Sequence, residues 1–440
     1  MSAHASRILG IAASLAMMGC GSAATQTPDM MPGMDMMPAP AARQLTAATG
    51  LSLAGMTTDG LVVVHTDDGN IQAFPTDGSP RVDLGHFTVG AADHGVVLVG
   101  EQDATTRRYS LSVYAKKTGR LVSLGDQIVD FTASDNDRIA LVEQEADGSA
   151  SLVLVNPDGG NRKVLKSGVI ATPGWHLRAF GRYLFATWSP SPNVGAAASV
   201  DLETDTLNEL GNPISNFAWN TWNQLYVLYG ASAEKTLVSL AGGPKINITN
   251  CASELLAMDA SAMLCATGAG SLDRVAFPSG DRSTLVPANV TQPLEGVGDL
   301  VLYESDAGVV SLRSIGRGTS IELTGYQFSN QLAIDRLIPS GQVMWVDKAA
   351  GKLHARGLDT AEVTFGEKVG YTERFRDSLV LVEMQGASAD VVDLHLFDAA
   401  NGQSHQVAAG ALPGKLGIPY SRNASSVAYE TAAGLFVSAL

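Results

Sequence analysis

The sequence of 440 residues predicts an all-β protein built from repeated units of four short strands. A short apolar segment recurs about every 41 residues along the chain. Turns rich in Asp, Gly and Asn separate this segment from further short segments of alternating polarity. No stretch combines a sustained helical periodicity with helix caps, so we expect little helix.

The recurring apolar segment marks ten units. Its copies are Leu61–Val64, Val96–Val99, Ile139–Val142, Leu184–Thr187, Leu225–Leu228, Met263–Ala266, Leu300–Tyr303, Val343–Val346, Leu379–Val382 and Val427–Tyr429. The distance from one copy to the next varies between 35 and 48 residues. Such variation is expected when insertions fall in the surface loops between the strands.

Three further segments complete each unit. In the first unit the turn Asp67–Asn70 leads to an alternating segment, Ile71–Phe74, and a second turn leads to the polar segment Arg81–Leu84. A fourth segment, His86–Gly90, leads into the next unit. Four short strands in about 41 residues are typical of one blade of a β-propeller. We therefore expect a propeller over residues 43–440, and no break in composition marks a linker between two smaller rings.

The two ends of the repeat region predict how the ring closes. The last unit ends with Leu435–Leu440 and lacks an outer strand, whereas Arg43–Thr46 precede the first unit and have the pattern of that missing strand. An N-terminal strand that completes the last blade would close the ring and remove an exposed sheet edge.

One segment resembles a known repeat family. The run Asp158–Leu165 resembles the outer strand of TolB-like (WD40-like) propeller repeats, whose blades usually contain a Ser-Pro-Asp-Gly turn. Here only weaker versions of that turn occur, such as Thr58–Gly60 and Asp259–Ser261. The resemblance extends over the repeat region and implies the propeller fold, but it does not imply a particular activity.

The first 19 residues have the pattern of an export signal. Arg7 is followed by the apolar segment Ile8–Met18, which is too short to span a bilayer as a stable helix. The run Met17–Cys20 resembles a bacterial lipobox, which implies that Cys20 is lipidated and becomes the first residue of the mature chain. The alternatives are an ordinary signal peptide with a chance cysteine, or cleavage near Ala23. Gly21 after the cysteine favours the outer membrane, with the protein facing either the periplasm or the outside.

Residues 20–42 are expected to form a flexible tether rich in Met and Pro. Its prolines break regular structure, and five of the 13 methionines lie in the stretch 28–40. Thioether sulfurs are soft ligands that prefer Cu(I), so a copper-handling lipoprotein is one alternative function. A plain spacer is the simpler interpretation.

The charge of the chain excludes two classes of partner. Its formal net charge is −15 and its isoelectric point is near 4.9. A nucleic-acid-binding protein needs a basic face that displaces counterions, and an anionic membrane surface attracts a basic patch. We therefore expect no nucleic-acid partner, and membrane association only through the lipid anchor.

Aromatic residues form the strongest candidate ligand site. Four of the five tryptophans, Trp175, Trp188, Trp219 and Trp222, lie within 48 residues of one another, in two adjacent units. Exposed aromatic rings anchor peptides and stack on sugars, whereas buried rings fill the space between blades. The sequence predicts Trp188, Trp219 and Trp222 as ligand-binding residues, with Trp219 and Trp222 the most exposed, and leaves the core interpretation open.

Acidic residues recur at the turn after the strand that enters each unit, just before the apolar segment. They are Asp59, Asp93, Asp135, Asp137, Asp259, Asp299 and Asp377. A pair of these carboxylates could hydrolyse or cleave a polysaccharide, but Asp at a turn usually caps its own backbone. His94 lies at one such turn, where it could line a funnel or be solvated. No nucleophile elbow, zinc motif or calcium loop occurs, so we expect no metal, no cofactor and no assembled catalytic residues.

Two cysteines remain after Cys20. Cys251 and Cys265 are fourteen residues apart, the second of them in a predicted strand. In an oxidising compartment they could form a disulfide, or they could be two separate buried thiols.

Together these features favour a lipid-anchored, non-catalytic propeller. It would act as an interaction platform for an envelope or surface protein, or for a glycan. A propeller hydrolase or lyase that acts on polysaccharide, and a copper-handling lipoprotein, are the alternative functions.

Overall fold

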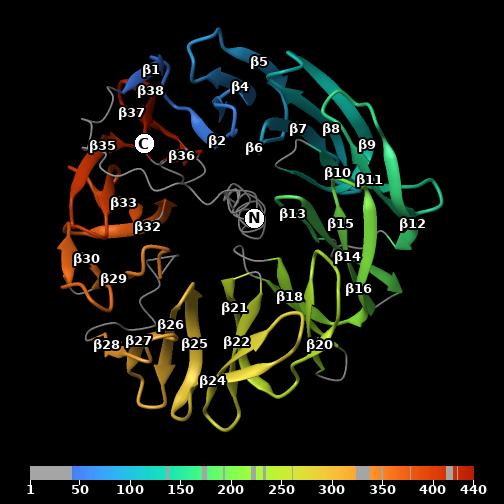
Figure 1. Ribbon diagram of the computed structural model, residues 1–440. Coiled ribbons are helices and arrows are strands. Elements are labelled where there is room, and N and C mark those ends of the chain that lie inside the picture. Colours follow the sequence, from blue (N-terminus) through green and yellow to red (C-terminus); the bar gives the residue numbers. More distant parts are fainter. Residues whose placement is uncertain are drawn as a thin grey trace. The chain divides into compact units, whose positions relative to one another are not determined.

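The computed structural model describes residues 42–440, apart from 135–137, 171–175, 192–193, 220–223, 231–233, 260, 324–336, 348–349, 377, 413–419 and 424. Every regular secondary-structure element in the described residues is a β-strand, which confirms the all-β prediction (Figure 1). None of these residues forms a helix long and apolar enough to cross a membrane. The predicted signal peptide, Cys20 and nearly all of the tether lie outside the described residues.

The chain divides into two compact units. Unit 1 consists of Met1–Asn212 and Gly410–Leu440, and unit 2 consists of Pro213–Ala409. Each unit is built from antiparallel sheets, most of them with four strands.

Unit 1 contains three sheets. The first has the strands β2 (Ser52–Met56), β3 (Leu61–His65), β4 (Asn70–Pro75) and β5 (Val82–His86). The second, an 11-stranded sheet, has β6 (Val89–Asp93), β7 (Val96–Gln102), β8 (Tyr109–Ala115), β9 (Arg120–Ala133), β10 (Ile139–Gln144), β11 (Ser149–Val155), β12 (Lys163–Ile170), β13 (His176–Phe180), β14 (Tyr183–Ser191), β15 (Val194–Asp201) and β16 (Thr206–Ile214). The third has β1 (Arg43–Thr46), β36 (Tyr420–Arg422), β37 (Ser426–Thr431) and β38 (Gly434–Ala439).

Unit 2 contains five sheets in chain order. The first two have β17 (Asn216–Trp219), β18 (Leu225–Tyr229), β19 (Lys235–Ser239) and β20 (Ile246–Asn247), then β21 (Cys251–Asp259), β22 (Ala262–Thr267), β23 (Leu272–Ala276) and β24 (Arg282–Val286). The third has β25 (Val290–Val297), β26 (Leu300–Ser305), β27 (Val310–Ser314) and β28 (Ser320–Glu322). The last two have β29 (Val343–Asp347), β30 (Lys352–Arg356) and β31 (Val363–Phe365), then β32 (Val369–Arg376), β33 (Leu379–Gln385), β34 (Val392–Asp398) and β35 (Ser404–Ala411).

The large sheet of unit 1 is three four-stranded repeats joined together. Strand β9 pairs with β8 through its first part and with β10 through its last part, so it is the outer strand of one repeat and the first strand of the next. The pair Ile170↔Ser189 joins β12 to β14, which belongs to the third repeat, β13–β16. Repeats that are separate sheets elsewhere therefore share one hydrogen-bonded ladder here.

The predicted boundaries of the repeats are wrong by one strand. In the repeats for which the structure describes four strands, the recurring apolar segment is the second strand, because the segment expected at the end of the preceding unit pairs with it. Val89–Asp93, for example, forms β6 and pairs antiparallel with β7 across a short turn. Strands β6 and β7 pair because only a tight turn separates them in the sequence. The outer strand of the preceding sheet, β5, lies at the other edge of its own sheet and does not pair with β6.

The apolar segments are buried on both faces, which explains why they lack alternation. In β3, Val62 and Val64 belong to an apolar cluster that includes residues of β37 and β38. Leu61 and Val63 belong to a different cluster that includes residues of β7 and β8. In unit 2, the residues on the two faces of β29 also belong to two different clusters, one with residues of β26 and the other with residues of β33. Successive sheets therefore stack face to face, as the blades of a β-propeller do.

The N-terminal strand pairs with the last sheet of the chain. In β1, Arg43 lies opposite Val437 and Thr46 lies opposite Leu435 of β38 (Figure 1). The Gln44 side-chain amide donates a hydrogen bond of 2.7 Å to the Ala433 carbonyl oxygen. The predicted pairing of Arg43–Thr46 with the C-terminal unit is therefore observed.

Candidate functional site

Asp93, one of the predicted turn acids, joins the first strands of two repeats. It ends β6, and its side chain is 8% exposed. One carboxylate oxygen accepts a hydrogen bond of 2.7 Å from the backbone N–H of Ala133 in β9. The other lies 2.7 Å from Nδ1 of His94. Both oxygens are thus used inside the protein, and Asp93 acts as a clamp between the first strands of two neighbouring repeats.

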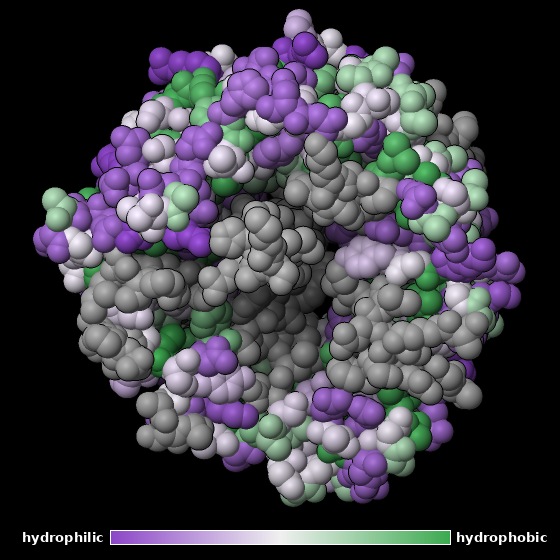
Figure 2. Space-filling model, turned by 180° about the vertical axis from the view of Figure 1, so that it is seen from behind, coloured by the Kyte–Doolittle hydropathy of each residue, from purple (hydrophilic) through white to green (hydrophobic). Residues whose placement is uncertain are grey.

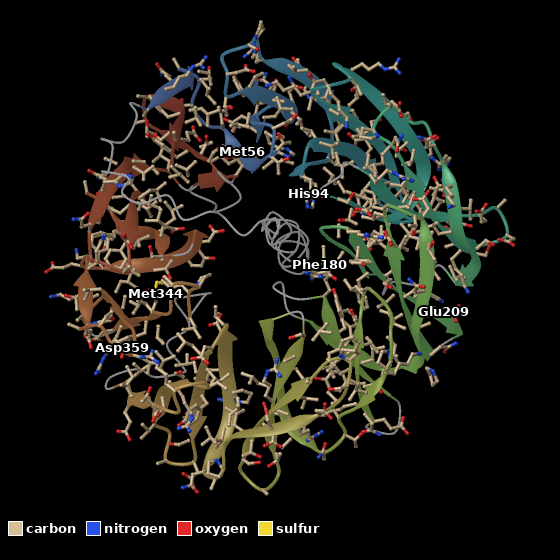
Figure 3. The ribbon with its side chains drawn as sticks, in the orientation of Figure 1. Met56, His94, Phe180, Glu209, Met344 and Asp359 are labelled. Carbon is tan, nitrogen blue, oxygen red and sulfur yellow. A yellow bond between two sulfur atoms is a disulfide. The ribbon has the colours of Figure 1, made fainter. Side chains whose placement is uncertain are left out.

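His94 is not the solvated turn residue that the sequence suggested. Its side chain is 8% exposed, and its backbone has a φ of +50°, in the left-handed region that few non-glycine residues adopt. Its carbonyl oxygen accepts a hydrogen bond of 2.7 Å from Thr58 N, in the turn after β2. Figure 3 shows His94 on the side of unit 1 where the first strands of the repeats lie. The contacts with Asp93 and Thr58 hold this residue in its costly conformation.

Asp130 repeats the same arrangement one repeat further along the chain. Its carboxylate accepts hydrogen bonds from Phe131 N, at 2.9 Å, and from Leu177 N in β13, at 3.3 Å. Burial raises the pKa of Asp130 to about 7, although both hydrogen bonds and the charge of Arg178 favour its ionised form. The desolvation of the carboxylate therefore outweighs the groups around it.

Two glutamates complete a set of carboxylates that join neighbouring repeats. In unit 1, Glu430 of β37 accepts hydrogen bonds from Gly50 N and Leu51 N, at 2.6 and 3.2 Å, just before β2. In unit 2, Glu295 of β25 accepts one of 2.9 Å from Leu337 N. We call Asp93, Asp130, Glu295 and Glu430 the inter-repeat clamps. Three of them could not be predicted from the sequence, because no spacing or motif distinguishes a clamp from a surface acid.

The other predicted acids that the structure describes also serve as acceptors. Asp59 accepts a hydrogen bond of 2.5 Å from the Thr57 hydroxyl. Asp299 accepts bonds from Gly316 N, at 2.6 Å, and from the Ser314 hydroxyl. The side chain of Asp259 lies outside the described residues, as do Asp135, Asp137 and Asp377. The described acids thus stabilise turns and strands through these hydrogen bonds, and they do not form a catalytic pair.

A pair of carboxylates that the sequence analysis missed lies in unit 2. Glu383 in β33 faces β32, where it lies opposite Tyr371, two residues from Glu373. Burial, and then the negative charge of Glu373, raise the pKa of Glu383 to about 7. A carboxylic acid that keeps its proton near neutral pH can act as a general acid. Hydrolysis would also need a cleft that admits substrate beside it.

Trp188 is part of the core, so the structure favours the core interpretation for this residue over a ligand-binding role. It is 5% exposed and belongs to an apolar cluster with Leu152, Leu184 and Ala198. The ammonium group of Lys166 lies 5.7 Å from the centre of the indole ring and covers it. A ligand therefore cannot stack on this ring without displacing the neighbouring sheet or Lys166.

Replacing Trp188 by Phe should reduce stability and leave partner binding unchanged. The smaller ring leaves a cavity in the cluster, and we expect a loss of about 2 kcal/mol in the free energy of unfolding. Urea denaturation of the variant and the wild type measures this loss. A variant that unfolds like the wild type but no longer binds a partner would contradict the core assignment.

The other tryptophans of the predicted sector cannot be assigned in the same way. Trp219 forms the last residue of β17, but its side chain lies outside the described residues. Trp175 and Trp222 lie outside them entirely. The assignment of Trp219 and Trp222 as ligand-binding residues thus stays a prediction.

Above Trp188, two neighbouring outer strands form a charged surface. Lys166 of β12 pairs with Glu209 of β16 at 2.9 Å, and Lys163 pairs with Asp205 at 3.5 Å. Val164, between the two lysines, is 57% exposed. We call Lys163, Val164, Lys166, Asp205 and Glu209 the β12–β16 surface. Its two ion pairs bridge the strands, so the charged groups flank a fixed apolar side chain.

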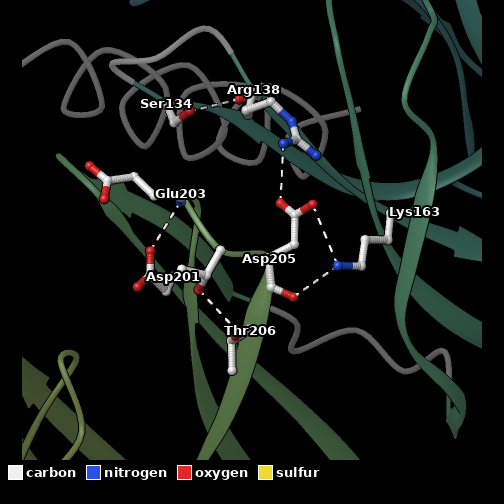
Figure 4. A network of polar contacts seen from close by, with 8 residues as sticks. Ser134, Arg138, Lys163, Asp201, Glu203, Asp205 and Thr206 are labelled. Atoms are coloured by element: carbon white, nitrogen blue, oxygen red, sulfur yellow. Dashed lines mark hydrogen bonds and ion pairs between the residues drawn. The ribbon is translucent and has the colours of Figure 1, made fainter.

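A polar network holds this surface in place (Figure 4). Asp205, in the turn before β16, also accepts a hydrogen bond of 3.1 Å from Arg138, which is largely buried near the start of β10. Arg182, in the turn between β13 and β14, pairs with Asp201 at 2.5 Å and with Glu203 at 2.7 Å, both on the β15–β16 hairpin. The β15–β16 hairpin is therefore tied to two other segments of unit 1. Such pre-ordering lowers the entropy cost of binding a partner.

Exposed apolar side chains are few elsewhere in the described residues. Only Leu121, Val164 and Val309 among their large hydrophobic side chains are markedly exposed. Figure 2 shows hydrophilic side chains over much of the coloured surface on one face, with hydrophobic patches small and scattered. A partner would therefore meet a mainly polar surface with single apolar contacts.

Cys251 and Cys265 form a disulfide in the structure. The bond joins the first strand of its sheet, β21, to β22, with the two Cα atoms 5.3 Å apart. Both cysteines are buried in the cluster that also contains Leu225 and Met263. The choice between a bonded pair and two separate thiols is thereby made in favour of the bond.

Reduction of this disulfide should destabilise the protein. The bond joins two residues with a sequence separation of 14. Releasing a loop of this size raises the conformational entropy of the unfolded chain, which lowers the free energy of unfolding by about 3 kcal/mol. Urea denaturation with and without dithiothreitol measures the difference. As a control, the Cys265→Ser variant should show the reduced stability under both conditions. Equal stability of the oxidised and reduced wild type would contradict the prediction.

The described residues contain no group of three or more His, Cys, Asp or Glu side chains placed to hold a metal ion.

No protein-family model and no curated protein matches the sequence. Solved structures do match the fold at low identity. The tricorn protease is 11% identical over 88% of this chain, with a TM-score of 0.29, and the match covers 38% of the protease chain. A eukaryotic initiation factor is 7% identical, covering 82% of this chain and 90% of its own, with a TM-score of 0.45. The β-propeller domain of the Trilobed protease from Pyrococcus furiosus is 11% identical, covering 80% and 92%, with a TM-score of 0.34.

Proposed function

We propose that this protein is a lipid-anchored, non-catalytic β-propeller that binds a protein or glycan partner in the bacterial cell envelope. The observation that supports binding over hydrolysis is the use made of the predicted acids. Asp93 and Asp299 accept hydrogen bonds from backbone and side-chain donors of their own or neighbouring sheets. Their lone pairs are committed to holding strands, and substrate chemistry would have to break those bonds first.

The proposal includes a single ring of ten blades. It rests on the ten apolar segments of the sequence and on the pairing of β1 with β38, which gives the last sheet its outer strand. A strand from the N-terminus in the C-terminal blade would fasten the two ends of the repeat region together.

The anchor is the lipid on Cys20, followed by the tether at residues 20–42. Its test is metabolic labelling with a palmitate analogue, followed by membrane fractionation, in a bacterial host. Wild type should carry the label and sediment with the outer membrane, whereas Cys20→Ser should carry no label. Labelling of the Cys20→Ser variant, or an unlabelled wild type, would overturn the anchor.

The partner would contact the β12–β16 surface. Val164 supplies an exposed apolar contact, and the paired Lys166 and Glu209 supply charges that a polar partner can match. Complementary charges favour association and fix its register, while a central apolar contact adds binding energy.

The test is affinity capture from native membranes, using the lipidated protein. Val164→Arg should capture the partner at least about ten-fold less than the wild type, since a cation replaces the apolar contact. Val309→Arg is the matched control, because Val309 is exposed in unit 2. Trp219→Ala/Trp222→Ala tests the aromatic residues in the same experiment. Equal capture by all four proteins, at equal melting temperatures, would overturn both candidate surfaces.

A further inference from the structure

A cavity of about 250 Å³ lies in unit 1, where the N-terminal strand meets the first sheet. Strand β1 forms one wall, and the end of β4 with the following turn forms the other. Its lining includes Arg43, Thr46, Phe74, Gly78, Ser79 and Arg81. The lining contains two arginines and no Asp or Glu, although the whole chain carries a net charge of −15.

The two guanidinium groups have hydrogen-bonding capacity left. Arg43 donates one hydrogen bond, of 3.0 Å, to the Thr76 carbonyl oxygen, and Arg81 makes one long contact of 3.5 Å with the Gln72 side chain. Within the described residues neither forms an ion pair. The nearest acid in the turn, Asp77, is already paired with Lys116 at 2.6 Å and accepts a bond from Ser79 N at 2.9 Å. The positive charge at the cavity is therefore not neutralised by that carboxylate.

Gly78 makes room for Arg43. A Cβ atom at residue 78 would lie 2.7 Å from Cζ of Arg43 and would overlap one of its terminal nitrogens. Gly78 also has a φ of +90°, which side chains rarely allow. The guanidinium thus packs directly on the backbone of the turn, and its position is fixed by the contact with Gly78 and by the bond to Thr76.

We infer that this cavity binds a phosphate group. Five N–H donors in a planar fork make each guanidinium suited to a tetrahedral oxyanion, and two forks at one cavity can bind it together. At physiological ionic strength charges beyond roughly 8 Å are screened, so the local arginines outweigh the negative charge of the whole chain. The cavity can hold more than a phosphate ion, so a phosphodiester such as a lipid headgroup fits the same chemistry as free phosphate.

Isothermal titration of the purified full-length chain tests the site, with two probes. Inorganic phosphate represents the free ion, and glycerophosphoglycerol represents the headgroup of phosphatidylglycerol. Wild type should bind at least one of them. Arg43→Gln and Arg81→Gln should each weaken binding at least about ten-fold, since each removes charge-assisted hydrogen bonds. Tighter binding of glycerophosphoglycerol would identify a lipid source, and tighter binding of phosphate a free one.

Two further variants make the test specific to this cavity. Gly78→Ala should weaken binding by displacing Arg43 without removing any charge. Arg120→Gln removes an exposed arginine of β9 that does not line the cavity and should bind like the wild type. All variants should melt within a few degrees of the wild type. Binding of neither probe to the wild type, or the same loss in Arg120→Gln as in Arg43→Gln, would overturn the inference.

Discussion

Asp93→Ala should lower the free energy of unfolding by about 4 kcal/mol, more than any other change at a predicted acid. The carboxylate is buried and accepts hydrogen bonds from Ala133 N and from His94, both at 2.7 Å. Alanine leaves two donors without an acceptor in a place that water hardly reaches, and each such loss costs about 1–3 kcal/mol. Urea denaturation measured by tryptophan fluorescence gives the value.

The matched variants separate the clamp from a general effect of removing charge. Asp93→Asn keeps an oxygen that can accept from Ala133 N, and should cost about 1 kcal/mol. Asp59→Ala removes an exposed acid that bonds only the nearby Thr57 hydroxyl, and should cost less than about 0.5 kcal/mol. If Asp93→Ala were as stable as Asp59→Ala, Asp93 would not hold the first strands together and would become free for catalysis.

The stability of the protein should fall as the pH rises from about 4 to about 7. Asp130 has a pKa of about 7 in the folded chain, against an ordinary value of 3.8, because it is buried. Between these values the folded state keeps a proton that the unfolded state has released, so the free energy of unfolding decreases with pH. This difference in the pKa of Asp130 corresponds to a contribution on the order of 4 kcal/mol to the free energy of unfolding. The contribution is present below pH 4 and is lost by pH 7.

Asp130→Asn should remove much of this slope, because the amide does not titrate. Glu383, with a pKa of about 7 in the folded chain, contributes in the same direction, and Glu383→Gln should remove its part. Asp201 acts below this range, since its ion pair with Arg182 lowers its pKa to about 2. Urea denaturation at half-unit intervals from pH 4 to pH 8 measures the slopes. The raised pKa of the buried Asp130 would be contradicted if the free energy of unfolding of the wild type stayed constant over this range. It would also be contradicted if the Asp130→Asn variant kept the wild-type slope.

The repeat and its strands could be predicted because burial on both faces leaves a visible trace. Apolar runs such as Leu61–Val64 have no alternation, and the turns between strands need Gly and Asp for their backbone geometry. The pairing of Arg43–Thr46 with the last sheet was also predictable, since the last unit lacked a strand. The boundary between units was not, because sequence periodicity gives the length of a repeat and leaves open which strand begins it.

The candidate site was harder to predict, because it depends on pairings between sheets. Nothing local distinguishes Trp188, which lies in the core under Lys166, from an exposed tryptophan. Asp130 reads as an ordinary acid in a strand until the structure brings Leu177 N to it. The Arg43–Arg81 cavity joins residues 38 positions apart that meet only because β1 lies beside the β4–β5 turn.

The most direct test of the interaction platform is site-specific photo-crosslinking in living cells. A photoreactive amino acid at position 164, in the β12–β16 surface, should yield one defined crosslinked product with an envelope component. The same amino acid at position 309 should not, although Val309 is also exposed. Loss of the product in Lys166→Glu, with normal folding, would place the partner at this surface. The same products from both positions, or none from position 164, would contradict binding there.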